Sequence, residues 1–135
     1  MSFYIRYVLT CDRTVALGEL EWVLRQVHPA YAIDGDLIRL GDAVYGIIDI
    51  THRGNPICDG DLELLARLAE TKKHRDAILA GVWDATSMVC VQLVNSLEPR
   101  TGEVLAPLWD WLLANRAGLL VWEGGHFFNP AGELK

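Results

Sequence analysis

The residues best suited to chemistry gather between positions 52 and 61. This segment joins an apolar, β-branched run to a helical pattern, and loops held by rigid elements often carry function. It contains His52, Cys58 and Asp59. A cysteine beside a histidine can form a thiolate nucleophile, and a position near a helix start favours the thiolate. These three residues are therefore the candidate catalytic group if the chain is an enzyme.

A structural interpretation of the same segment competes with the catalytic one. Asp59 and Asp61 place two negative charges beside Cys58, and these charges oppose formation of a thiolate. The sequence marks neither an oxyanion hole nor a third residue that would orient the histidine. A capped helix start with a small buried thiol explains the segment more simply, and we favour this interpretation.

The spacing of the histidines, cysteines and glycines points to no metal or cofactor. The four histidines form no HxxxH or HExxH pattern, and the three cysteines form no CxxC pair. The glycines form neither a GxGxxG motif nor a phosphate-binding loop. We therefore expect no metal site and no cofactor. Free thiols suit a reducing compartment.

The aromatic residues are more informative than the titratable ones. At 100° per residue, Trp22 lies about 160° from the leucine stripe of its helical segment, so it does not share that core. The final hairpin is too short to bury both of its faces alone. Aromatic residues that lack a local partner are frequent interface anchors. The predicted interface residues are Trp22, Trp111, Trp122, Phe127 and Phe128, and a homodimer is the expected assembly.

Strand and helix patterns alternate along the chain and position these residues. The alternation in residues 3–10 predicts a strand that is apolar on both faces. Further strands are predicted at residues 44–51, 77–83 and 88–95. Apolar stripes predict helices at about 14–27, 59–75 and 104–115, the last starting near Val104 because Pro107 belongs in a first turn.

The order of these elements suggests a duplication. A strand, a helix and a hairpin occur in residues 3–40 and again in residues 88–129, and Leu17, Leu20 and Leu24 recur at a constant offset. Such units build antiparallel sheets that carry helices on one face. We predict one α+β domain over residues 1–135, with three helices on one face of a mostly antiparallel sheet. The arrangement is ferredoxin-like or a duplicated strand–helix–hairpin.

Composition narrows the range of functions. Twelve Lys and Arg against eighteen Asp and Glu give a net charge of −6, which argues against binding to nucleic acid or to an anionic membrane. The sequence shows no signal-peptide pattern and no apolar run of about 18 residues that could span a bilayer, so we expect a cytoplasmic protein.

These observations favour a non-catalytic interaction or regulatory protein, such as an inhibitor or immunity-type binder. Its net charge of −6 would steer a basic protein partner, and aromatic anchors would hold that partner. The alternative is a small cytosolic enzyme or ligand-binding protein that uses the loop at residues 52–61.

Overall fold

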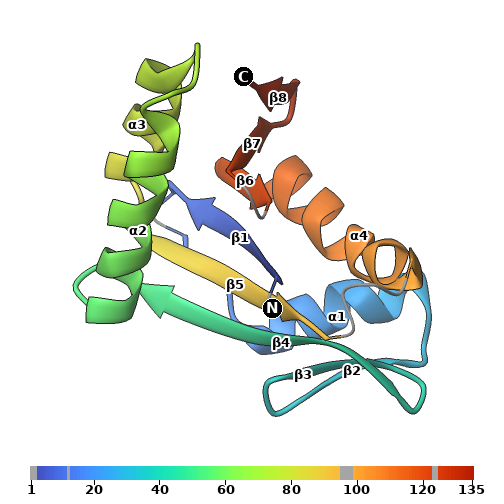
Figure 1. Cartoon of the computed structure of the whole chain (residues 1–135). Coiled ribbons are helices and arrows are strands. Elements are labelled where there is room, and N and C mark those ends of the chain that lie inside the picture. Colours follow the sequence, from blue (N-terminus) through green and yellow to red (C-terminus); the bar gives the residue numbers. More distant parts are fainter. Residues whose placement is uncertain (1–2, 12, 95–98, 123–124) are drawn as a thin grey trace.

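The computed structural model describes residues 3–11, 13–94, 99–122 and 125–135 (Figure 1). The first half of the chain forms β1 (Phe3–Leu9), α1 (Leu17–Val27), β2 (Tyr31–Asp34), β3 (Leu37–Leu40), β4 (Ala43–His52) and α2 (Pro56–Ala69). The second half forms α3 (Arg75–Trp83), β5 (Ser87–Leu93), α4 (Pro99–Asn115), β6 (Gly118–Trp122), β7 (His126–Asn129) and β8 (Gly132–Leu134).

The described strands form one eight-stranded sheet in the order β2-β3-β4-β5-β1-β6-β7-β8. Every neighbouring pair is antiparallel. The prediction of an α+β protein with a mostly antiparallel sheet is therefore confirmed. The central strands β1 and β5 pair along their full lengths, from Phe3 opposite Leu93 to Leu9 opposite Ser87.

Helices cover both faces of this sheet (Figure 1). Alternate residues of β1 enter different cores: Ile5 and Tyr7 pack with α1 and α4, and Val8 packs with α2 and α3. The prediction of three helices on one face is therefore wrong in number and placement, because the described chain has four helices, two on each face. At Val8 and Leu9 the strand is apolar and buried on both sides, and such a stretch needs cover on both sides.

Residues 77–83, predicted as a strand, lie in helix α3. A short apolar run does not distinguish a strand from a buried helical turn by its pattern alone. Within α3, Ile78 and Val82 are four residues apart and both face the core. Gly81 allows close contact with β6, since a Cβ at this position would lie 2.6 Å from Leu119 Cδ1.

Helix α4 starts earlier than predicted, and Pro107 lies inside it rather than in its first turn. A proline here removes one backbone hydrogen bond, the one that would reach the carbonyl of Glu103. Buried side chains on either side of the proline hold the helix to the sheet, among them Leu105, Leu108 and Leu112. Tertiary packing therefore outweighs the local preference for a helix end.

Two strand–helix–strand units build the centre of the sheet. One runs from β1 through α1 and the β2–β3 hairpin to β4, and the other runs from β5 through α4 to β6. The four central strands lie in the order β4-β5-β1-β6, with α1 and α4 on the same face. Helices α2 and α3 lie between β4 and β5 in the chain and cover part of the opposite face (Figure 1). Within the described ranges, none of the helices is both long and apolar enough for a membrane span.

Candidate functional site

The structure gives the three residues of the predicted catalytic group different surroundings. His52 is exposed at the end of β4. Cys58 is fully buried and packs in the core beneath α2. Asp59 accepts a hydrogen bond on Oδ1 from the backbone N–H of Gly54, at 3.0 Å, and so closes the turn before the helix.

The thiol of Cys58 is held in its protonated form. Burial raises its pKa, and the nearby carboxylates of Asp59 and Asp61 raise the pKa further, whereas a hydrogen bond with Thr51 lowers it. In the same loop, Asn55 Oδ1 accepts a hydrogen bond from the N–H of Ile57 at 2.9 Å and caps helix α2. The loop thus builds a helix start and presents no activated nucleophile.

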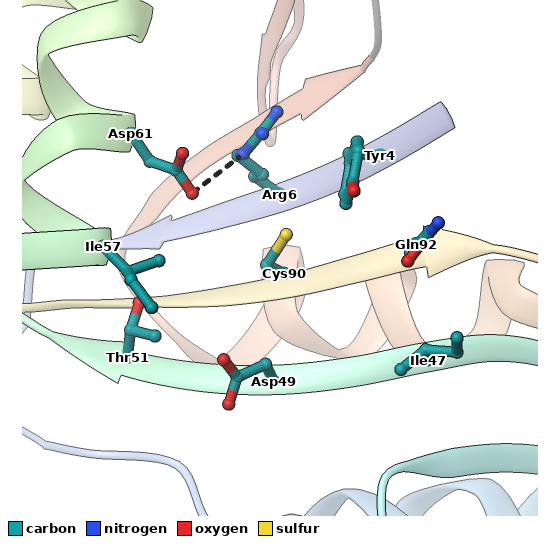
Figure 2. Close-up of a pocket in the computed structure, with 9 residues that line it drawn as sticks. All are labelled: Tyr4, Arg6, Ile47, Asp49, Thr51, Ile57, Asp61, Cys90 and Gln92. Carbon is teal, nitrogen blue, oxygen red and sulfur yellow. Dashed lines mark hydrogen bonds and ion pairs between the residues drawn. The ribbon is translucent and has the colours of Figure 1, made fainter. Parts of the chain in front are cut away.

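A cleft of about 370 Å³ lies on the part of the sheet that α2 and α3 leave uncovered (Figure 2). Three central strands supply its floor and α2 supplies one wall. Its lining residues are Tyr4, Arg6, Ile47, Asp49, Thr51, Ile57, Asp61, Cys90 and Gln92. We call this site the cleft.

Strand register brings the polar side chains of the floor together. Cys90 of β5 stands opposite Arg6 of β1 on one side and Asp49 of β4 on the other. Neighbouring strands are about 4.8 Å apart, so this row spans roughly 10 Å from β4, which carries Asp49, to β1, which carries Arg6. Gln92 stands between Tyr4 and Ile47 in the next row. The cleft therefore has a rigid floor with one cation and one anion at its sides.

Arg6 is fixed by two contacts. Its Nε donates to Asp61 Oδ2 at 3.4 Å, and its guanidinium carbon lies 5.1 Å from the centre of the Tyr4 ring (Figure 2). Asp49, in contrast, is exposed and makes no ion pair within the described part of the chain. One guanidinium faces two carboxylates, so the ionised lining of the cleft is negative. Ile57, 64% exposed, adds an apolar rim.

None of the sequence-based predictions included this floor, although its signal is present in the strands. Polar residues occupy alternate positions: Arg6 in β1, Asp49 and Thr51 in β4, and Cys90 and Gln92 in β5. A strand whose polar residues share one face exposes that face to solvent. Only the register shows that the three polar faces are adjacent.

The five aromatic residues predicted as interface anchors differ in how much of each side chain is exposed. Trp22 is 61% exposed and Trp122 is 38% exposed. Phe127 is fully buried in the core beneath α2 and α3, because its neighbour across the strands, Val121, faces the same core. Phe128 and Trp111 are partly buried against the other core. Only the two tryptophans Trp22 and Trp122 are therefore well placed as surface anchors.

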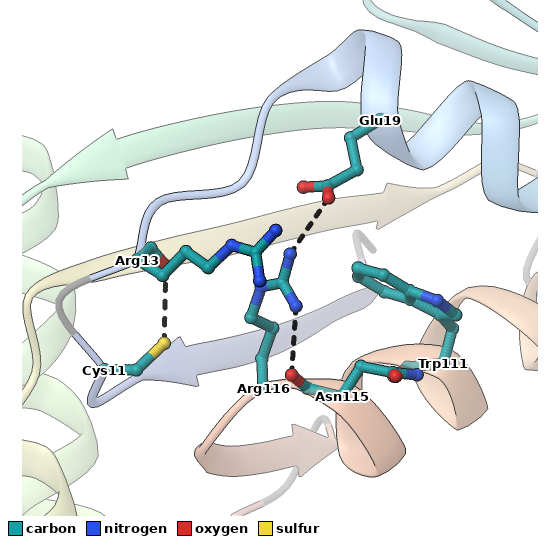
Figure 3. Close-up of polar contacts among 6 residues, drawn as sticks. All are labelled: Cys11, Arg13, Glu19, Trp111, Asn115 and Arg116. Carbon is teal, nitrogen blue, oxygen red and sulfur yellow. Dashed lines mark hydrogen bonds and ion pairs between the residues drawn. The ribbon is translucent and has the colours of Figure 1, made fainter.

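Trp111 takes part in a structural contact between α1 and α4 (Figure 3). The guanidinium of Arg116 lies 4.8 Å from the centre of the Trp111 ring. Arg116 also donates from Nη2 to Glu19 Oε2 at 2.9 Å and from Nη1 to the carbonyl of Asn115 at 3.0 Å. Because the side chain of Arg116 is only 6% exposed, these contacts keep a buried charge partnered.

No group of three or more His, Cys, Asp or Glu side chains in the described ranges is arranged to hold a metal ion. Comparison of the chain with known protein families, curated proteins and solved structures finds no match. The geometry of the cleft and its surroundings is therefore the basis for a function.

Proposed function

We propose that the protein is a non-catalytic binding protein whose cleft receives a basic, amphipathic segment of a partner protein. The observation that carries this proposal is the exposed carboxylate of Asp49, which forms no ion pair with the described residues and lies on the open floor with the exposed Ile57 at the rim. A net charge of −6 favours the approach of a basic partner.

Helix α2 supplies an apolar wall next to this floor. Ile57, Leu64 and Leu68 are 64%, 40% and 37% exposed. At 100° per residue they lie within about 40° of one another, so they form one stripe, and Asp61 stands beside it. An amphipathic segment fits such a surface, because its apolar face would cover the stripe and its cations would meet Asp49 and Asp61.

The competing function is a small enzyme or a protein that binds a small molecule. The loop at residues 52–61 gives this function little support, since Asn55 and Asp59 are engaged in the helix start and the pKa of Cys58 is raised. The cleft volume of about 370 Å³ falls in the range of small-ligand sites. A small ligand in the cleft is therefore the alternative that an experiment must separate.

The test uses two designed helical peptides that differ in charge. Both carry leucine on one face, and the opposite face carries lysine in one peptide and glutamate in the other. The lysine peptide should bind and the glutamate peptide should not. Asp49→Asn should weaken binding roughly three- to fivefold, as for one exposed ion pair, and Ile57→Ser about tenfold.

Asp42→Asn is the matched control, because it removes the same charge from an exposed turn away from the cleft. Equal weakening by Asp42→Asn and Asp49→Asn would mean general electrostatic attraction and would contradict the proposal. Thermal protection by a metabolite, lost in Asp49→Asn, together with no peptide binding, would establish the small-ligand alternative.

We also infer a ferredoxin-like core and a reducing, cytoplasmic setting. The core is supported by the order β4-β5-β1-β6 with α1 and α4 on one face, which follows the strand–helix–strand pattern repeated twice. The setting is supported by the thiol state of the three cysteines, Cys11, Cys58 and Cys90.

A further inference from the structure

A second cavity, of about 330 Å³, lies beside α2 on a side that the cleft does not reach. It is lined by Arg53, Gly54, Asp59, Leu62, Glu63 and Trp83, and we call it the Trp83 cavity. Asp59 and Glu63 lie about 120–160° around the helix from Ile57 and Asp61, which line the cleft. The two cavities therefore flank the first turns of α2.

The ring of Trp83 is open to a ligand. Trp83 ends α3 and is 53% exposed. In the described chain, an arginine lies over the ring of Tyr4 and another over the ring of Trp111, at 5.1 and 4.8 Å, but none lies over Trp83. This protein thus covers two aromatic rings with its own cations and leaves the ring beside Asp59 and Glu63 uncovered.

The charges of the Trp83 cavity favour a cation. Asp59 and Glu63 contribute two carboxylates, and Arg53 contributes one guanidinium. The guanidinium of Arg53 is directed to the protein, since its Nη2 donates to the carbonyl of Val82 at 3.2 Å. An aromatic face attracts a cation within about 6 Å of the ring centre, and adjacent carboxylates strengthen the attraction.

We propose that the Trp83 cavity binds a lysine or arginine side chain of the partner, stacked on Trp83 and paired with Glu63. This inference rests on the proposed function, because it names a second contact of the same basic partner. It requires no change in the fold, since the ring and both carboxylates already line one cavity.

The test follows the indole N–H signals of the five tryptophans by heteronuclear NMR, with assignments from single Trp→Phe variants. The probes are Nα-acetyl-lysinamide, Nα-acetyl-argininamide and the uncharged Nα-acetyl-norleucinamide. At least one of the two cationic probes should shift the Trp83 signal saturably, and the norleucine probe should not. The exposed Trp22, which lines neither cavity, is the internal control.

Glu63→Gln should weaken probe binding about threefold or more, by loss of a charge partner. Glu70→Gln, at the C-cap of the same helix and outside the cavity, should leave probe binding unchanged. An unshifted Trp83 signal with both cations, or equal shifts at Trp22 and Trp83, would overturn the inference.

The two proposals fail separately. In the lysine-peptide assay, Trp83→Leu should weaken binding roughly two- to fivefold, the contribution of one exposed cation–π contact. Peptide binding that depends on Asp49 but not on Trp83 would overturn the Trp83 inference and leave the cleft proposal standing. Probe binding at Trp83 without peptide binding would overturn the cleft proposal, and it would limit the Trp83 cavity to a site for isolated cations.

Discussion

At the scale of single residues, burial decides which ionisable groups react. Cys58 is fully buried and its pKa is raised, so its thiolate is scarce and a reagent cannot reach it. In the native protein, iodoacetamide should modify Cys58 more slowly than Cys90, which lines the cleft and is partly exposed. In urea the two rates should converge. Peptide mapping by mass spectrometry measures both rates, and fast native labelling of Cys58 would restore the hypothesis of a catalytic thiol.

Tyr7 should make stability fall in alkaline solution. Its hydroxyl donates to the carbonyl of Arg116 at 2.6 Å, and burial first, with nearby Cys11 second, raises its pKa from 10.0 to about 12. A group whose pKa is higher in the folded than in the unfolded protein stabilises the folded state fully at pH values below the unfolded-state pKa. The contribution of Tyr7 is therefore lost as the pH rises from 10 to 12. The loss is on the order of 2 to 3 kcal/mol.

Urea unfolding at a series of pH values tests this expectation, with Tyr7→Phe as the comparison. The phenylalanine variant should start less stable, because the Arg116 carbonyl loses its partner, and its stability should fall less steeply from pH 10 to 12. Parallel pH curves for the parent and Tyr7→Phe would contradict the assignment.

At the scale of elements, α1 protects the edge of the sheet at β2. Glu21 Oε2 accepts a hydrogen bond from the N–H of Ile33 at 2.7 Å, and Arg25 Nε donates to the carbonyl of Tyr31 at 3.0 Å. Both backbone groups belong to the edge strand. An edge strand with unpaired backbone groups is a template for association with other chains. Side chains of α1 therefore take the place that a further strand would occupy.

Glu21→Ala should weaken this protection. The Ile33 N–H would lose its acceptor, which costs about 1–2 kcal/mol for a partly buried group. Static light scattering over time, together with urea unfolding, should show faster aggregation and lower stability. Glu21→Gln keeps an acceptor oxygen and should lie close to the parent. Aggregation of Glu21→Gln as fast as that of Glu21→Ala would show that charge, and not the backbone hydrogen bond, protects the edge.

At the scale of the whole molecule, the homodimer stays a prediction, and Trp22 is its best anchor. Trp22 is 61% exposed on the outer side of α1, and a ring of this size contributes strongly to an interface when it is buried. Sedimentation or light scattering at micromolar concentration should give a dimer mass for the parent and a monomer mass for Trp22→Glu. A monomer mass for the parent would end the prediction.

The sequence by itself determined the local elements. Alternation in β1, the leucine stripe of α1 and the apolar stripe of α2 each follow from side-chain periods that a few neighbouring residues define. The antiparallel α+β class follows from their order along the chain. Residues 77–83 and Pro107 were misread because a short apolar run is ambiguous and because packing overrides a local helix-breaking preference.

The tertiary structure alone decided which sides the helices cover and where a site forms. The cleft floor needs Arg6, Asp49 and Cys90 from three strands, and only their register makes them neighbours. The core beneath α2 and α3 buries Phe127 and leaves Trp83 at the surface, although both are aromatic residues near the end of a helix or strand. Side-chain period is a local property of the backbone, whereas burial and adjacency depend on contacts between segments that are far apart in the chain.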